Sequence, residues 1–178
     1  MSDRRTLRVT LAELGLDVRG SAASWAAFSP CGRYRYALGR SWEPLIPGKT
    51  LVAAGHNPST ATDEKTDNTL GLLVKLAKRE GCTALVLVNR FAWRSTDKKP
   101  LLTVGDPVGP LNDLVVKLAL DSAAGGPILF CWGRVDHRID DVRDWFFGRA
   151  AKCLSKNVDG SPGHPLYLPG DAPLLEWP

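Results

Sequence analysis

The sequence predicts an α/β protein, a three-layer α/β/α sandwich with a central, mainly parallel sheet and an N-terminal β addition. Short apolar segments alternate with longer segments of helical periodicity in most of the chain, which is typical of parallel βαβ units with right-handed crossovers. The length of 178 residues suits one domain, and 44% hydrophobic with 24% charged residues is ordinary for a globular protein. We therefore expect one domain over residues 1–178, with a β-rich extension at 1–46 and an α/β core at 47–178.

The N-terminal extension is expected to contain strands. Residues 24–29 (SWAAFS) and 33–39 (RYRYALG) have the composition of strands, and the S-P-C-G sequence between them is a turn signal. The first residues are basic but lack the apolar core of a secretory signal, and no apolar run approaches the ~18 residues needed to span a bilayer. The expected location is the cytoplasm, without membrane contact.

The core is expected to begin with a strand, a helix and a second strand. Residues 50–55 (TLVAAG) form a short apolar run that indicates a buried strand. A helix is predicted from Asp67 or Asn68, both good N-cap residues, to Gly81, because apolar side chains recur between them at helical spacing. Residues 83–89 (TALVLVN) are apolar almost throughout, as in a parallel strand buried on both faces.

The second half of the core is expected to repeat this alternation. A helix is predicted over 111–123, where glycines end it. Residues 127–132 (PILFCW) form the next predicted strand, and a long helix is predicted over 134–154. The proline-rich tail after residue 160 is expected to be mainly loop, with at most one short strand.

A net charge of +4 and a pI of about 9.0 are compatible with a polyanionic partner. Basic residues gather in three segments, which are Arg33, Arg35 and Arg40; Arg90, Arg94, Lys98 and Lys99; and Arg134, His137 and Arg138. The segments are either three solvated loops or parts of one surface that binds an anion, depending on where the fold places them.

The four cysteines and three histidines do not indicate a metal site or a cofactor. No C-x-x-C pair occurs, whereas iron–sulfur and zinc sites usually show closely spaced ligands. Cys82 and Cys131 fall at or within apolar runs, where a cysteine is usually a small buried hydrophobic residue. Disulfides are not expected in a cytoplasmic chain. The expected oligomeric state is a monomer.

Polar residues gather where the predicted parallel strands end, which is the edge at which such sheets bind ligands. The segments at this edge are Gly55-His56-Asn57-Pro58-Ser59, Asn89-Arg90-Phe91 and Trp132-Gly133-Arg134, and the tail adds Gly163-His164-Pro165-Leu166. Motifs for a phosphate-binding loop, a dinucleotide fold and a nucleophile elbow are missing from the sequence. The sequence therefore predicts one crevice that combines amides, an imidazole and other hydrogen-bond donors.

Four short blocks resemble the uracil-DNA glycosylase superfamily. GHNPST, VLVNRF, LFCWGR and GSPGHPL follow the order of that superfamily's G-x-[DN]-P loop, strand ending in Asn, third apolar strand and C-terminal H-P loop. The chain also resembles a bacterial and phage family known only as a domain of unknown function, through RYALGRSW (35–42), DNT (67–69) and SPGHPLYL. This closer resemblance covers about residues 33–168, and the glycosylase resemblance about 50–168.

The glycosylase resemblance implies a monofunctional DNA glycosylase that flips a pyrimidine out of the stack and hydrolyses its N-glycosidic bond. Asn57 would position the attacking water, and His164 would stabilise the departing base. Because an amide replaces the superfamily's carboxylate at Asn57, Asp67 or Asp63 is a further candidate to activate the water.

The resemblance and the basic segments also suggest residues for the base and the DNA. The base-binding candidates are Gly55, His56, Pro58, Ser59, Asn89 and Phe91, with Trp93 as a further stacking candidate. The DNA-binding candidates are Arg33, Arg40, Arg90, Arg94 and Arg134, with Leu166 or Tyr167 as the wedge that fills the vacated position. In uracil-specific members a Tyr stands where this chain has Ser59, and its ring excludes a C5 substituent. The smaller side chain implies a pyrimidine modified at C5 and a role in defence against phages that carry such bases.

Two other classes of function remain open. A binding protein could keep the pocket for modified DNA or nucleotides without the chemistry, and a hydrolase of free nucleosides or nucleotides would need less basic surface. Basic residues on the face of the crevice favour DNA, whereas scattered basic residues favour a small molecule.

Overall fold

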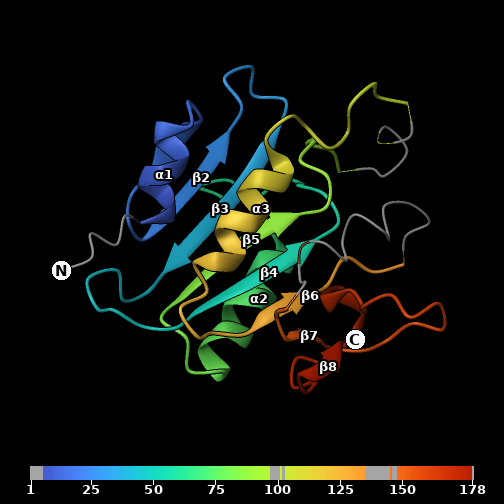
Figure 1. The fold of residues 1–178 in the computed structure, drawn as a ribbon. Helices are drawn as coiled ribbons and strands as arrows, with labels where there is room; N and C mark the ends of the chain where they lie inside the picture. The colour runs from blue at the N-terminus through green and yellow to red at the C-terminus, as the bar shows by residue number, and fades with distance from the viewer. Residues whose placement is uncertain (1–5, 97–100, 102, 135–144, 146–147, 178) are drawn as a thin grey trace.

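The computed structural model describes residues 6–96, 101, 103–134, 145 and 148–177 (Figure 1). Within these residues the sheet has eight strands, which are β1 (Asp17–Gly20), β2 (Ser24–Phe28), β3 (Arg35–Ser41), β4 (Thr50–Gly55), β5 (Ala84–Asn89), β6 (Ile128–Phe130), β7 (Ala151–Cys153) and β8 (Leu175–Trp177). Their order across the sheet is β1-β2-β3-β5-β4-β6-β7-β8. The central strands β5, β4, β6 and β7 are parallel, and antiparallel strands flank them on both sides. The predicted α/β class is confirmed, and the complete sheet is mixed.

The N-terminal addition extends the same sheet. β1, β2 and β3 pair antiparallel in chain order, and β3 pairs antiparallel with β5, with Leu38 opposite Leu87. A short helix that the β-rich prediction omits, α1 (Leu7–Glu13), precedes these strands and buries Leu11. Val9 and Thr10 are β-branched and favour strands, so packing of Leu11 into the core outweighs local propensity here.

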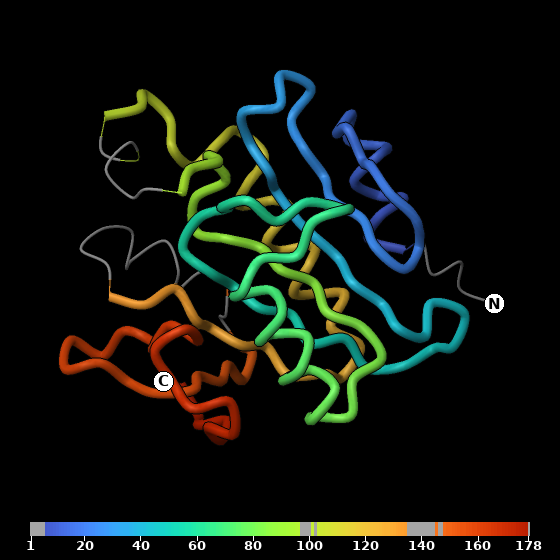
Figure 2. The backbone as a smooth tube through the Cα atoms, turned by 180° about the vertical axis from the view of Figure 1, so that it is seen from behind, coloured from blue at the N-terminus to red at the C-terminus, as the bar shows by residue number. Residues whose placement is uncertain are grey.

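Helices on both faces of the sheet complete the three layers. α1 and α3 (Asn112–Asp121) lie on the face turned to the viewer in Figure 1, and α2 (Asn68–Arg79) covers the opposite face, which Figure 2 shows. Asp67 caps α2, because its Oδ1 accepts the N–H of Leu70 at 2.9 Å. The predicted helices at 67–81 and 111–123 are thus confirmed, with small differences at their ends.

The C-terminal part differs most from the sequence prediction. Of the helix predicted over 134–154, residues 135–144, 146 and 147 lie outside the described residues, but 151–153 form β7, so the prediction is wrong there. β7 pairs parallel with β6 and antiparallel with β8. Ala151 and Cys153 are buried while Lys152 is half-buried. This is the two-residue alternation of a strand, but a strand of three residues is too short for the alternation to be recognised in the sequence. The tail also contains a 3₁₀ turn, η2 (Pro165–Tyr167).

In the part of the chain that the structure describes, no helix is long and apolar enough to cross a membrane. Nor does any group of three or more His, Cys, Asp or Glu among those residues have the arrangement of a metal site. Cys82 and Cys131 are buried, as predicted, whereas Cys31 is exposed.

Candidate functional site

A cavity of about 660 Å³ opens at the edge of the sheet where β4, β5 and β6 end. Parallel pairing creates this position, since Gly55 at the end of β4 is in register with Asn89 at the end of β5. The N-terminus of α2 and the tail around η2 complete the wall. The predicted site residues that line it are Gly55, His56, Asn57, Ser59, Asp67, Asn89, Arg134, His164, Leu166 and Tyr167. The volume lies within the ~300–1,000 Å³ of typical small-molecule sites.

Asn57 keeps its amide oxygen available in this cavity. Its Nδ2 donates to the backbone oxygens of Ser95 at 2.7 Å and Pro58 at 3.2 Å. Carbonyl oxygens only accept hydrogen bonds, so these two partners fix the orientation of the amide. No group in the described residues donates to Asn57 Oδ1. The oxygen can therefore accept a hydrogen from a water molecule or from a ligand.

Asn89 has an unused hydrogen-bond donor at the floor of the cavity. Its side chain is 2% exposed, and its Nδ2 meets no acceptor among the described residues. A Cβ at Gly55 would lie 2.8 Å from Asn89 Oδ1, so the glycine leaves room for this amide. A buried donor without a partner costs about 1–3 kcal/mol, which a ligand carbonyl in the cavity would recover. One amide offers both a donor and an acceptor, as does the polar edge of a pyrimidine.

His164 has a fixed tautomer when neutral. Its side chain caps η2, where Nδ1 accepts the N–H of Leu166 at 3.3 Å. A nitrogen that accepts a hydrogen bond carries no proton, so the neutral imidazole carries its proton on Nε2. Gly133 allows the close approach of this segment to the end of β6, because a Cβ there would lie 3.2 Å from that of His164. The imidazole can thus act as a hydrogen-bond donor to a ligand oxygen.

Asp67 and Asp63 occupy different surroundings. Asp67 lines the cavity while its Oδ1 caps α2, so its other oxygen remains for a water or a ligand. Asp63 does not line the cavity, and its backbone oxygen accepts a hydrogen bond from the Ser24 hydroxyl. Of the two carboxylates suggested by the sequence, only Asp67 is placed to contact a ligand in the cavity.

The other base-binding and wedge candidates lie behind the cavity or at its mouth. Pro58 is buried outside the cavity lining. Phe91 is 7% exposed, and its ring meets the edge of His56 with centroids 5.3 Å apart. We therefore correct the prediction that Phe91 binds the base directly, because Phe91 does not line the cavity and instead packs against His56, which does. Leu166 and Tyr167 line the cavity with exposed fractions of 46% and 85%, which suits a mouth position.

A shallow basic groove continues from the cavity. Arg33, Lys65 and Arg94 line it together with Trp93, and none of the described residues in its lining is acidic. Ser59, Ser95 and Thr96 line both the groove and the cavity. Arg134 lies on the cavity wall and pairs with Asp159 at 3.2 Å. Part of the predicted basic surface is thus adjacent to the site.

Two of the predicted DNA-binding arginines lie elsewhere. Arg90 is fully buried, with its guanidinium carbon 5.2 Å from the ring centre of Trp132, so its prediction as a surface contact is wrong. Arg40 donates to the backbone oxygens of Thr62 and Lys65 and lines a hollow at the opposite, amino-terminal edge of β4 and β5. Its prediction as a DNA contact near the crevice is therefore also corrected. Lys98, Lys99, His137 and Arg138 lie outside the described residues.

Arg35 was expected from the sequence as one member of a basic segment, but not as a residue of the crevice. This arginine begins β3, is 2% exposed and lines the cavity. Its indications in the sequence were its place in the basic segment with Arg33 and Arg40 and in the RYALGRSW block, within a predicted strand that is otherwise mainly apolar and aromatic. That position gave no reason to place it beside Asn89, because β3 and β5 pair only in the folded sheet.

A comparison with protein-family models identifies the family of this chain. Residues 35–166, more than half of the chain, match the family described as Protein of unknown function (DUF1643). The chain belongs to this family. Comparisons with curated proteins and with solved structures give no match. The family match agrees with the resemblance to a domain of unknown function, and these comparisons do not support a link to the uracil-DNA glycosylase superfamily.

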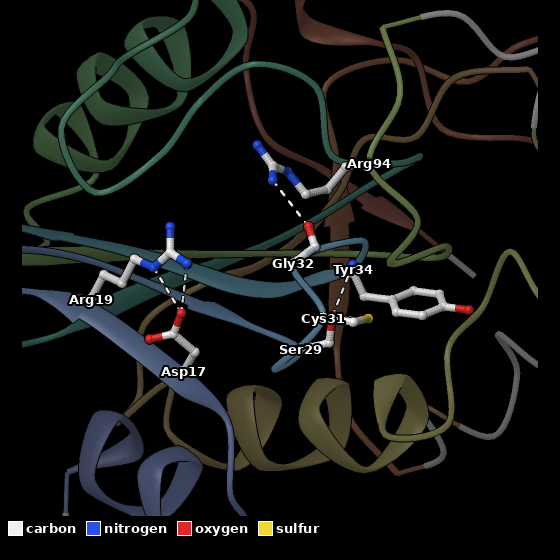
Figure 3. Close-up of polar contacts among 7 residues, drawn as sticks. All are labelled: Asp17, Arg19, Ser29, Cys31, Gly32, Tyr34 and Arg94. Carbon is white, nitrogen blue, oxygen red and sulfur yellow. Dashed lines mark hydrogen bonds and ion pairs between the residues drawn. The ribbon is translucent and has the colours of Figure 1, made fainter.

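Cys31 directly precedes Gly32 and Arg33, which line the basic groove, and the pKa of its thiol is lowered. The Ser29 hydroxyl lies 3.2 Å from its sulfur, and Figure 3 shows the two residues together with Tyr34 and Arg94. Hydrogen bonds from Ser29 and then Arg33 lower the pKa of Cys31 to about 7 from its ordinary value of 9.0. Burial raises the pKa of Cys131 to about 12, so that thiol stays protonated.

We predict that Cys31 reacts with iodoacetamide near neutral pH. Its alkylation rate should rise with pH and reach half of its maximum near pH 7, because the thiolate is the nucleophile. Ser29→Ala should move this midpoint upward, since the Ser29 hydrogen bond is the largest cause of the lowered pKa. Mass spectrometry of the labelled native protein locates the adduct. A midpoint near pH 9 in the unaltered protein would contradict the assignment.

Proposed function

We propose that the protein is a DNA glycosylase that hydrolyses the N-glycosidic bond of a flipped pyrimidine. The observation that carries this proposal is the convergence of Asn57, Asn89 and His164 on one cavity at the carboxyl ends of parallel strands. Each of the three offers a different atom that the reaction needs, and their types and order match the glycosylase blocks in the sequence. No cofactor is required for this hydrolysis.

The reaction needs a positioned water and a stabilised leaving group. Cleavage of the C1′–N bond leaves an oxocarbenium-like sugar and places the bonding electrons on the base. Asn57 Oδ1 can orient a water toward C1′, but an amide cannot take its proton near neutral pH. The available oxygen of Asp67 is the group suited to accept that proton. His164 Nε2–H and the Asn89 amide would stabilise the departing base by hydrogen bonds.

The basic groove supports DNA as the form in which the pyrimidine is bound. Arg33, Lys65 and Arg94 form a positive path that reaches the cavity through shared lining residues. Phosphates on either side of a flipped nucleotide would lie along such a path. The exposed Leu166 and Tyr167 at the mouth would enter the position in the stack that the base leaves.

A hydrolase of free nucleotides is the second candidate. One observation favours it: Arg35 is buried in the cavity wall. This arginine could bind a charged small molecule without a contribution from the basic groove. A binding protein without chemistry would use the same cavity. Assays that follow base release separately from binding distinguish these three functions.

Asn57 and His164 should be required for base release and not for folding. Asn57→Ala is expected to lower the single-turnover rate about 10²-fold or more, because it removes the positioned oxygen. His164→Ala should also lower the rate, through loss of the donor to the base. The assay uses end-labelled oligonucleotides with varied bases and alkali to cut abasic sites.

Thermal unfolding of the same variants provides the folding control, since both side chains lie on loops at the sheet edge. Asn57→Asp is a useful companion, because a carboxylate could raise the rate if water activation limits it. Full single-turnover rates in both alanine variants would remove these residues from the mechanism.

Binding to DNA should depend on salt through the groove. Each phosphate contact adds about 0.9 to the magnitude of the log–log salt slope on duplex DNA. Arg33→Ala combined with Arg94→Ala should therefore reduce the slope by about 1.8. Lys75→Ala, which removes an exposed charge on α2, is the control and should leave the slope unchanged. Fluorescence anisotropy measures both, and an affinity independent of salt would instead favour a free nucleotide.

The cavity should accept pyrimidines enlarged at C5. Ser59 lines the cavity, and its small side chain leaves open space that a larger side chain would fill. A C5 substituent can occupy this space, so duplexes with 5-hydroxymethyl or glycosylated pyrimidines should release their base. Ser59→Tyr should abolish release of these bulky bases, whereas Ser59→Ala should retain it. A pocket discriminates by about 1–3 kcal/mol per methylene, so smaller bases should remain substrates. Release of uracil alone from such a panel would rule out the proposed C5 preference, and with it the suggested defence against phages with modified bases.

A further inference from the structure

Arg35 is a buried cation with unused hydrogen-bond donors. Its side chain is 2% exposed, and Nη1 donates to the backbone oxygen of Ala61 at 2.7 Å. Nε is buried and meets no acceptor in the described part of the chain. A guanidinium carries five N–H groups, so most of its capacity is unused although it lines the cavity.

The charge of Arg35 also lacks an ion-pair partner among the described residues. The negative charge of Asp67 favours the charged form of Arg35, but no carboxylate of the described residues lies within 4.0 Å of the guanidinium. Burial outweighs Asp67 and lowers the pKa of Arg35 to about 10. Arg35 therefore remains a cation at neutral pH, in surroundings where an unpaired charge is costly.

The N-terminus of α2 faces the same cavity. Asn68 and Thr69, in the first turn of this twelve-residue helix, line the cavity beside Arg35. The N–H groups of a first turn have no partner within the helix, and the positive end of the helix dipole favours an anion there. The Asp67 cap satisfies only the N–H of Leu70. Four residues that carry hydroxyl groups, Ser59, Ser95, Thr96 and Ser155, are also part of the cavity lining.

We propose that Arg35 and the N-terminus of α2 form a binding site for a phosphoryl group of the ligand, which rests on the proposed nucleotide-directed function and deepens it. A phosphoryl group supplies the negative charge that Arg35 lacks and several acceptors for its fork of N–H groups. The helix N-terminus and the hydroxyl-lined wall suit the same group. A neutral base edge would leave the buried cation unpaired.

The phosphoryl group has two possible sources, a free nucleotide or a nucleic acid strand, and a binding experiment separates them. Isothermal titration of the full chain uses deoxyuridine and deoxyuridine 5′-monophosphate in one arm. The other arm uses a single-stranded oligonucleotide with its ordinary phosphodiester backbone and the same oligonucleotide with uncharged methylphosphonate linkages. We expect a preference of at least tenfold for the phosphorylated ligand in one arm, and competition by inorganic phosphate. Equal affinities in both arms would overturn the proposal without the need for any variant.

Variants then assign the preference to Arg35. Arg35→Met should abolish it, and Arg35→Lys should retain a weaker preference, because lysine keeps the charge and loses the fork. Without ligand, Arg35→Met should unfold at the same or a higher temperature than the unaltered protein, since it removes an unpaired buried charge. A preference that survives in Arg35→Met would overturn the proposal. If that variant does not fold, an undiminished preference in Arg35→Lys would overturn it instead.

Arg40→Met is the matched control. The Arg40 guanidinium donates to the backbone oxygens of Gly39, Thr62 and Lys65 and does not line the cavity. This variant should lose stability and retain the preference for phosphorylated ligands. These binding measurements are independent of base release. A preference for phosphorylated ligands without base release would support the anion site and contradict the glycosylase function. Base release without that preference would support the glycosylase function and contradict the anion site.

Discussion

The parallel pairing of β4 with β5 and β6 is the constraint on which the candidate site depends. Parallel strands end at the same edge, so the chain must turn there several times within a short distance. Gly55 and Asn89 are brought side by side by this register, although they are far apart in the sequence. The loop after β4, the start of α2 and the C-terminal tail then complete the wall. A different register would move Asn89 away from Asn57 and His164 altogether.

The polar groups at this edge are costly for the folded state. Asn89 Nδ2 and Arg35 Nε are both buried without acceptors in the described residues, at the end of a sheet whose interior is otherwise packed with aliphatic side chains. Each such group lowers the free energy of unfolding by an amount comparable to a lost hydrogen bond. Asn112, on the other face of the same region, donates from Nδ2 to two backbone oxygens, those of Asn89 and Arg90, but its buried Oδ1 accepts no hydrogen bond from the described residues. Unsatisfied buried groups therefore occur away from the cavity as well, but those of Asn89 and Arg35 belong to residues that line it, where a polar ligand can satisfy them.

The N-terminal strands contribute to the site as well as to the sheet. β3 pairs with β5 and places Arg35 next to the end of β5, so the segment before residue 47 supplies one wall of the cavity. The family match begins at Arg35 and ends at Leu166 in η2. These limits include both of the outer segments that close the cavity around the central strands. The expected division into an extension and a core therefore has no counterpart in the way the site is built.

The sequence by itself determined the α/β class, the strands β4, β5 and β6, the helices α2 and α3, and the strand-end segments that line the cavity, because these depend on local periodicity and on the common edge of parallel strands. It also indicated Asn57, Asn89 and His164, whose residue types suit the edge. Only the tertiary structure decided the roles of the arginines. Arg35 lines the cavity, Arg90 packs in the core and Arg40 holds a loop, although all three occur in basic segments of similar composition. Whether a long cationic side chain points to solvent, to a ring or to a cavity depends on its neighbours across the sheet, which local sequence does not encode.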